Sequence, residues 1–385
     1  MTVVGTVGML GLGTMLVGEL RGGRSPQPGL VSASLVSTAV ASSMLAIVVL
    51  LVMYIGHLKT FDVTDVLIDV LFVLGAALTG VSFVLDLALI GLGAGPLQLA
   101  RNSVFALVKW LLLYTLLPVI SRDSAGGVLA AWVVGLAVSF AVLALPTATT
   151  LRTLVARPDW ATLRSLRGAT SAHNAFNLAG QVPRLLLPVM ATTVISPSAG
   201  AAFFIAWMIA GFLYVIPTHL STALFAIGAG RLDELAEKLR FSFRLSLAFG
   251  IIAGPVLAIL APQLLRIFGA DYSASGTASL QLLTIAYVPM AIKTHYIAVM
   301  RVQGRLRQGS FVAVTGALFE LVGAAVGARL YGINGLTIGV LVGLTIEAAI
   351  MSPTLLRAGP SIFFRHASRA GRAGLGEDVN APSDL

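Results

Sequence analysis

The sequence has no cysteine and few charged residues, which make up 11% of its 385 positions. The absence of cysteine excludes disulfides and thiolate metal sites. A soluble domain carries about 25% charged residues, and half of that amount cannot cover a water-soluble protein of this length. Because 57% of the residues are hydrophobic, most of the surface must face lipid.

Enzyme motifs are also absent from the sequence. It contains no phosphate-binding glycine loop, no His-Glu-x-x-His zinc motif and no Gly-x-Ser-x-Gly nucleophile motif. The connections expected on the outer side are short, the longest being about 264–275 and 57–65. No extracellular catalytic domain fits into them, so we expect no enzymatic activity, no cofactor and no metal site.

Long apolar runs fill most of the chain. A helix needs about 20 apolar residues to cross a hydrocarbon layer of about 30 Å, and these runs lack the two-residue alternation of a barrel strand. The sequence therefore predicts an all-α polytopic membrane helix bundle. The eleven predicted spans are 3–19, 30–56, 66–90, 102–120, 128–147, 176–196, 200–226, 244–263, 276–300, 309–328 and 334–355.

Lysine and arginine are distributed unequally between the loops of the two sides. Eighteen lie in one set of alternate loops and the C-terminal tail, four lie in the other set, and Lys109, Arg184 and Lys293 lie within spans. Cation-rich loops stay in the cytoplasm, so the sequence predicts an inner (plasma) membrane protein with a cytoplasmic C-terminus. The net charge of +9 indicates contact with anionic membrane lipid rather than with nucleic acid.

The two halves of the chain resemble each other. Ser103 recurs as Ser310 and Gly135 as Gly343, at offsets of 207 and 208 residues, and the span order and directions agree at that offset. Parallel duplication of a six-helix unit is common among transporters. We predict an N-terminal lobe at 1–147, a cytoplasmic linker at 148–175, a C-terminal lobe at 176–356 and a disordered tail at 357–385.

Within the linker, Trp160, Leu163 and Leu166 recur at helical spacing. This pattern predicts a short amphipathic helix at the membrane surface, and an irregular basic loop is the alternative. The first lobe has one predicted span fewer than the second, and its first span begins at Met1. We therefore expect a further span upstream of Met1.

Small residues at four-residue spacing form three motifs, Gly250-x-x-x-Gly254, Gly323-x-x-x-Gly327 and Gly339-x-x-x-Gly343. Such motifs let helices approach closely. We interpret them as packing contacts within the bundle, not as a dimer motif.

Two stretches carry a resemblance to a known family. Leu264-Leu-Arg-Ile-Phe-Gly-Ala-Asp-Tyr-Ser-Ala-Ser and the proline-containing 282–292 resemble the polysaccharide flippases of the multidrug/oligosaccharidyl-lipid/polysaccharide exporter superfamily. Gln303-Gly304-Arg305 and 331–336 are further points of similarity.

The resemblance implies two six-helix lobes around a central cavity, with both chain ends in the cytoplasm. It also implies that the protein flips a polyprenyl-diphosphate-linked oligosaccharide from the inner to the outer leaflet, for cell-surface polysaccharide such as the O-antigen of lipopolysaccharide. The lobes would rock to give alternating access, and glycosyltransferases or the polymerase of the pathway would be partners. The sequence departs from the family pattern because it lacks the first span.

Ionisable side chains inside spans cost about 3 kcal/mol each, so they face the bundle interior or a water-filled cavity. Asp86 and Lys109 lie near the cytoplasmic ends of adjacent antiparallel spans, which makes a salt bridge between them feasible. Arg184, between Pro183 and Pro188, and Lys293 have no evident partner. Such cations suit a diphosphate, and the alternative is an ion pair with Glu320 or Glu347.

These considerations select two sets of candidate residues. The candidate substrate-binding residues are Arg184, Lys293, Tyr296, His295 and Lys109, and the candidates for a coupling proton or sodium ion are Asp86, Glu320 and Glu347. A cation-coupled multidrug exporter of the same superfamily is the alternative function, and it would need an acidic cavity. A polysaccharide polymerase or ligase would need a large external loop, and a scaffold without transport activity also remains open.

Overall fold

The computed structural model describes residues 1–21, 28–55, 66–116, 125–144, 154, 156–228 and 235–358, and within them the regular structure is entirely helical. The predicted all-α class is therefore confirmed. The elements are α1 (Thr2–Gly8), α2 (Leu12–Arg21), α3 (Pro28–Ile55), α4 (Val66–Gly91), α5 (Gly95–Leu116), α6 (Ala125–Ser139), η1 (Phe140–Ala144), α8 (Trp160–Ser165), α9 (Arg167–Met190), the π-helical turn η2 (Ala191–Ile195), α10 (Pro197–Gly228), α11 (Leu235–Arg266), α12 (Ala270–Ile285), α13 (Tyr287–Val302) and α14 (Leu306–Ala358).

Seven of the described helices are long and apolar enough to cross a membrane, and nine spans result if each of two bent helix pairs is one span. One pair is α1 with α2, bent by 53° where Leu10 and Gly11 have positive φ. The other is α12 with α13, bent by 46°. α14 contains non-helical backbone at Tyr331 and Gly332, which divides it into two arms. If the two arms are counted separately and α5, which carries Arg101 and Lys109, is added, the helices correspond to the eleven predicted spans.

The outer surface of these helices is apolar. Ile55, Phe212, Ile251 and Phe311 are each more than 70% exposed. Such a surface is unfavourable in water but stable against the hydrocarbon chains of a bilayer.

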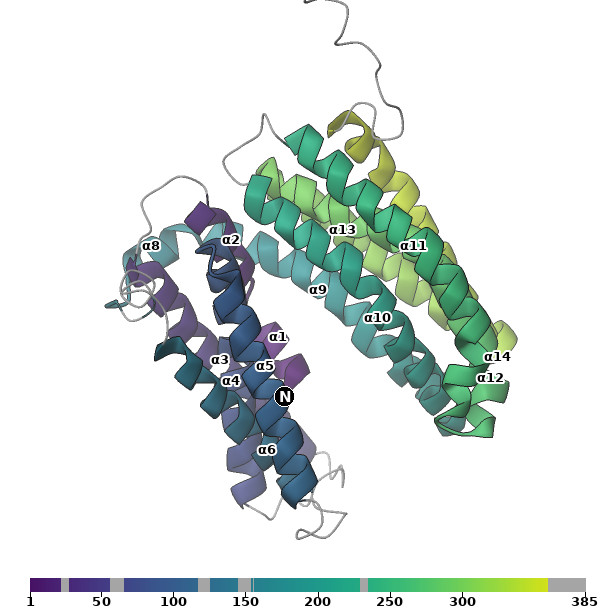
Figure 1. The fold of residues 1–385 in the computed structure, drawn as a ribbon, viewed down its shortest axis with the longest axis horizontal. Coiled ribbons are helices and arrows are strands. Elements are labelled where there is room, and N and C mark those ends of the chain that lie inside the picture. The colour runs from purple at the N-terminus through teal and green to yellow at the C-terminus, as the bar shows by residue number, and fades with distance from the viewer. Residues whose placement is uncertain are drawn as a thin grey trace, which may run out of the picture.

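The helices form two bundles, α1–α6 and α9–α14, which approach each other where α2 meets α9 and diverge toward the opposite end (Figure 1). The contacts between them are made chiefly by α1 and α2 with α9 and α10. The end at which they meet also carries α8, the start of α11 and the turn between α13 and α14 (Figure 1). We call this end the basic side, because Arg157, Arg164, Arg167, Lys238 and Arg305 lie there.

Glycine determines how closely α2 approaches α9. A Cβ atom on Gly11 would lie 2.5 Å from the Thr170 carbonyl oxygen and 2.4 Å from the Asn174 nitrogen, which is closer than van der Waals contact allows. Gly18 lies against the ring of Phe225. We call the contact of Gly11, Thr14 and Gly18 with Thr170, Asn174, Asn177 and Phe225 the seam.

The linker contains the predicted short helix, α8. Asp159 caps it, since its carboxylate accepts hydrogen bonds from the Thr162 hydroxyl at 2.6 Å and the Thr162 nitrogen at 3.0 Å. The bond from the hydroxyl is the main reason that the pKa of Asp159 is held below its usual value. Leu163 and Leu166 pack against the first bundle, whereas residues 145–153 and 155 lie outside the described residues.

The two bundles are packed similarly but not identically. α10 packs on α12 and α13 much as α1 and α2 pack on α4. α9 packs along α14, and among the described residues no helix of the first bundle lies on α5 and α6 in the equivalent way. The further span upstream of Met1 stays a prediction, and the tail from residue 359 lies outside the described residues.

The glycine motifs of α14 join its two arms. A Cβ atom on Gly339 would lie 2.0 Å from the Gly323 carbonyl oxygen, and one on Gly327 would lie 1.9 Å from the Gly335 carbonyl oxygen. The backbones of the two arms therefore touch. This agrees with the prediction that these glycine motifs make packing contacts within the bundle.

Replacing Gly339 with valine should destabilise the protein by about 1–3 kcal/mol, because the added side chain overpacks the arms of α14. Thermal unfolding of the detergent-purified variant measures the loss. Gly211→Val is the matched control, since Gly211 also lies inside a long helix but has open space around its Cβ position. Equal melting temperatures for the two variants would contradict the close contact.

Candidate functional site

Three charged side chains meet inside the second bundle. Lys293 of α13 donates a hydrogen bond to Glu320 Oε1 on one arm of α14 and forms an ion pair with Glu347 Oε2 on the other arm at 2.9 Å. All three side chains are at most 4% exposed. Gly316 makes room for the cluster, because a Cβ atom there would lie 2.2 Å from the Glu347 carboxyl carbon.

This cluster has one cation for two carboxylates. Glu347 Oε1 has no hydrogen-bond partner, and the contact of Oε2 with Lys293 is an ion pair without hydrogen-bond geometry. A buried unbalanced carboxylate is costly, so the cluster is suited to take up a proton or a monovalent cation.

The expectation that Lys293 has no partner is therefore wrong, and the alternative of an ion pair with Glu320 or Glu347 is correct for this residue. Its neighbours are also interior. His295 contacts the Ala291 carbonyl oxygen at 2.8 Å and the Ser242 hydroxyl at 3.1 Å, and Tyr296 is buried. In this conformation neither Lys293 nor these two neighbours presents its side chain to a substrate.

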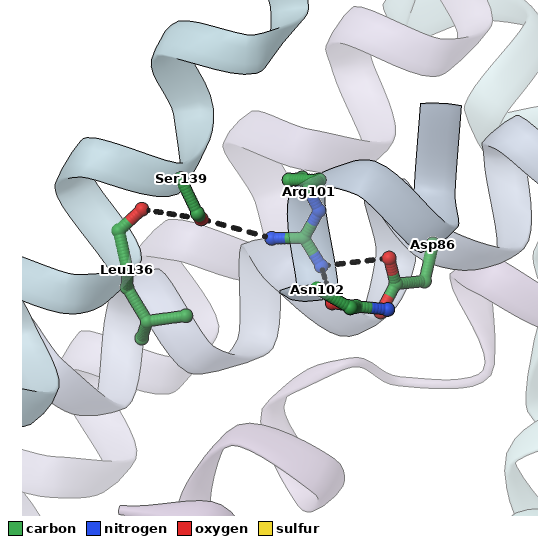
Figure 2. Close-up of polar contacts among 5 residues, drawn as sticks. All are labelled: Asp86, Arg101, Asn102, Leu136 and Ser139. Carbon is green, nitrogen blue, oxygen red and sulfur yellow. Dashed lines mark hydrogen bonds and ion pairs between the residues drawn. The ribbon is translucent and has the colours of Figure 1, made fainter. Parts of the chain in front are cut away.

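A second charged network lies inside the first bundle, between α4, α5 and α6. Arg101 Nη2 donates to Asp86 Oδ1 and to Asn102 Oδ1, both at 2.7 Å (Figure 2). Its Nη1 donates to the Ser139 hydroxyl at 3.5 Å, and the guanidinium stacks 5.6 Å from the Phe140 ring centroid. Arg101 is fully buried, so its prediction as a loop cation is wrong.

The predicted salt bridge between Asp86 and Lys109 is also wrong, because Asp86 pairs with Arg101. Lys109 instead places its ammonium 5.0 Å from the Phe105 ring centroid and 4.9 Å from that of Trp132. Cation–π contacts of this kind partly replace a counter-ion.

The two networks occupy corresponding positions of the repeat on the first and last of their three helices, whereas Arg101 and Glu320 on the middle helices are 219 residues apart and do not correspond. Asp86 and Lys293 are 207 residues apart, and Ser139 and Glu347 are 208 residues apart, the same offsets that relate the two halves of the sequence. In each bundle, charged and polar side chains therefore link the last three predicted spans. The first of these three spans carries the acidic Asp86 in the first bundle and the basic Lys293 in the second.

Arg184 differs from these buried charges because its side chain is exposed. The structure gives it no hydrogen bond or ion pair with the rest of the described chain. It follows Asn177 by seven residues, two turns of α9, and so lies on the same face of that helix. Because Asn177 contacts Thr14 of the first bundle, this face of α9 is turned toward the first bundle.

Sequence reasoning missed a cation at the seam. Arg301, counted among the loop cations, lies in the last turn of α13 and is partly buried. Its guanidinium stacks 5.2 Å from the Phe176 ring centroid and 5.9 Å from that of Phe225, and Nη2 donates to Asn177 Oδ1 at 3.0 Å. The sequence contains one indication of a polar site here: His173 and Asn177 are four residues apart, the spacing of one helix face, at the start of the predicted span 176–196.

Comparisons with known proteins agree with this architecture. The MatE family model matches residues 178–326, and no curated protein matches the sequence. Three solved structures share the fold. They are a MATE transporter in the bent conformation (TM-score 0.75, 15% identity, 93% of this chain and 85% of that chain), a mutant of the Vibrio cholerae MATE transporter VcmN (0.72, 18%, 94% and 87%) and a MOP superfamily transporter from Pyrococcus furiosus (0.71, 16%, 93% and 85%).

The chain is thus a multi-pass membrane protein with the fold of the MATE transporters.

Lys293→Met should destabilise the protein by about 3–5 kcal/mol, because it leaves Glu320 and Glu347 buried without their cation. The triple variant Lys293→Met/Glu320→Gln/Glu347→Gln should regain most of that stability, since no charge is then left unpaired. Thermal unfolding in detergent measures both. If Lys293→Met alone is as stable as the parent protein, the cluster does not hold the bundle together.

Proposed function

We propose that this protein is a MOP superfamily transporter that flips a lipid-diphosphate-linked oligosaccharide from the inner to the outer leaflet, for the synthesis of cell-surface polysaccharide. The observation that carries the proposal is that Arg184 is exposed and lies two turns of α9 beyond Asn177, which contacts the first bundle. A guanidinium without a carboxylate partner is a ready site for phosphate oxygens, which it binds as a bidentate fork.

The charge balance of the helices at the bundle interface supports an anionic substrate. Arg184 on α9 and Arg301 on α13 are cations whose guanidinium groups contact no carboxylate among the described residues. The acidic side chains Asp86, Glu320 and Glu347 are paired inside their own bundles, and Glu19 is the one acidic residue of α1, α2, α9 and α10 within the described residues. For the Pyrococcus furiosus MOP superfamily transporter, a reversed polarity of the binding pocket suggests a different function, and the polarity here fits a substrate that carries phosphate.

The fold supports alternating access. The bundles meet at the seam on the basic side and diverge at the other end (Figure 1). With the basic side in the cytoplasm, as the loop cations favour, this conformation is closed to the cytoplasm. The C-terminus is then cytoplasmic too. The sugar-diphosphate head would enter between the bundles while the prenyl tail stays in lipid, and rocking of the bundles would expose it to the outer side.

The Lys293–Glu320–Glu347 cluster supports a role in coupling. Its unbalanced carboxylate would take up a proton or sodium ion and so link the ion gradient to movement of the arms of α14. This coupling role rests on the interior position of the cluster, and it assigns Lys293 to the ion and not to the substrate.

Arg184→Ala should lower the rate of flipping by about tenfold to a hundredfold, the value of one charge-assisted hydrogen bond or a bidentate pair. Arg184→Lys should retain part of the activity. The assay follows a fluorescent prenyl-diphosphate disaccharide between the leaflets of proteoliposomes, and thermal unfolding checks that each variant is folded.

Arg329→Ala is the matched control for Arg184→Ala, because it removes another exposed arginine that lies outside α9. Equal loss in both variants would indicate a general effect of charge. The same liposomes test the alternative function: gradient-driven movement of ethidium without any flipping of the lipid would instead establish a cation-coupled multidrug exporter.

A further inference from the structure

Four polar side chains cluster under the seam on the basic side. They are His173, Asn174 and Asn177 of α9 and Arg301 of α13. Three atoms among them are buried without a hydrogen-bond partner: His173 Nδ1, Asn174 Oδ1 and Arg301 Nε. Buried polar atoms are rarely left unpaired, so this grouping calls for a ligand in another state of the protein.

Arg301 lacks a counter-charge here. The one polar acceptor that it contacts among the described residues is the neutral amide of Asn177, at 3.0 Å. The rings of Phe176 and Phe225 flank the guanidinium and leave its edge as the donor surface. His173 packs on the same Phe225, with ring centroids 6.0 Å apart, and is only 5% exposed. The Arg301 guanidinium and the His173 imidazole thus pack against the same ring, that of Phe225.

The first bundle covers this cluster. Asn177 Nδ2 donates to the Thr14 hydroxyl at 3.2 Å, and the Thr14 hydroxyl lies 3.4 Å from Asn177 Oδ1. Gly11 lies directly on the backbone of Asn174. If the bundles part on the basic side, Thr14 leaves Asn177, and the cluster opens toward the basic loops.

We propose that Arg301 and His173 form an entry site for the phosphate group of the substrate, closed in this conformation because Thr14 holds Asn177 Oδ1 on the guanidinium. This inference rests on the proposed function and deepens it. A phosphate has several acceptor oxygens for the donors of Arg301 and for an N–H of His173. A phosphate bound as a bidentate pair at the Nε–Nη2 edge of Arg301 needs the Nη2 group on which Asn177 Oδ1 lies in this conformation, so closing of the seam and this mode of phosphate binding compete.

The proposal also gives the phosphate a direction of travel. Arg184 lies seven residues beyond Asn177 on α9, about 10.5 Å along the helix axis at about 1.5 Å per residue, toward the end where the bundles diverge. When the seam closes, Asn177 displaces the phosphate from Arg301, and Arg184 is the next cation along the helix.

The test measures binding of geranylgeranyl diphosphate to the full-length protein in nanodiscs, by isothermal calorimetry. Thr14→Val removes the hold on Asn177 and should tighten binding by about two- to tenfold, the value of one hydrogen bond. Arg301→Gln in that background should weaken it by at least about tenfold, as expected for a lost charged partner. Thr115→Val is the matched control, because Thr115 bonds only carbonyls of its own helix.

A merely structural role for Arg301 predicts a different result. In that case Thr14→Val leaves the affinity unchanged or lowers it, Arg301→Gln lowers the melting temperature without changing the affinity, and the proposal is overturned. Asn177→Ala gives a second measurement if Arg301→Gln does not fold. It should tighten binding as Thr14→Val does, and weaker binding would again overturn the proposal.

The choice of probe identifies the source of the phosphate. Tighter binding of geranylgeranyl diphosphate than of inorganic pyrophosphate, with no binding of geranylgeraniol, supports a lipid substrate. Equal binding of the two diphosphates overturns the lipid assignment. If the parent protein flips the lipid while Arg301→Gln changes neither binding nor flipping, only the entry site fails. If the parent protein neither binds nor flips any lipid diphosphate, the proposed function itself fails.

Discussion

The contact of α2 with α9 on the basic side is the constraint on which the arrangement of the two bundles depends. It relies on Gly11, whose positive φ and missing side chain allow its backbone to lie on that of Asn174. The hydrogen bonds between Thr14 and Asn177 are the polar part of the same contact. One surface therefore joins the bundles, covers Arg301 and leaves Arg184 exposed two turns further along α9.

The buried charges explain why the bundles would move as units. Asp86 with Arg101 and Lys293 with Glu320 and Glu347 each tie helices of one bundle together. Separating such a pair inside a membrane costs several kcal/mol, whereas parting the seam breaks neutral hydrogen bonds worth about 1 kcal/mol each and the apolar contacts of Val17 and Gly18 with the second bundle. Neither ion-pair network crosses between the bundles, so a rocking motion would open the seam and leave both networks intact.

The sequence was sufficient to predict the order of the spans, because the length of an apolar run reflects the thickness of the bilayer directly, but it did not predict the bends between α1 and α2 and between α12 and α13. It also led to the repeat, whose offset of 207 residues places Lys293 where the first bundle has Asp86. Which buried charged residues form ion pairs with each other was not predictable from the sequence, since this depends on the register between neighbouring helices. Asp86 pairs with Arg101 and not with Lys109, eight residues further along α5, because α5 begins at Gly95 and brings Arg101 inside the bundle. Arg301 was missed for a related reason, since only the tertiary contact with Phe176 and Phe225 shows that it is not a loop residue.

We infer that transport requires the seam to open, and the absence of cysteine from the sequence allows a direct measurement of this. The double variant Thr14→Cys/Asn177→Cys can be oxidised in proteoliposomes to join α2 to α9, and flipping of the prenyl-diphosphate disaccharide is then measured before and after reduction. We expect that the oxidised protein does not flip the lipid, that reduction restores flipping, and that each single-cysteine variant is unaffected by oxidant. Full flipping by the cross-linked protein would show that the seam need not open.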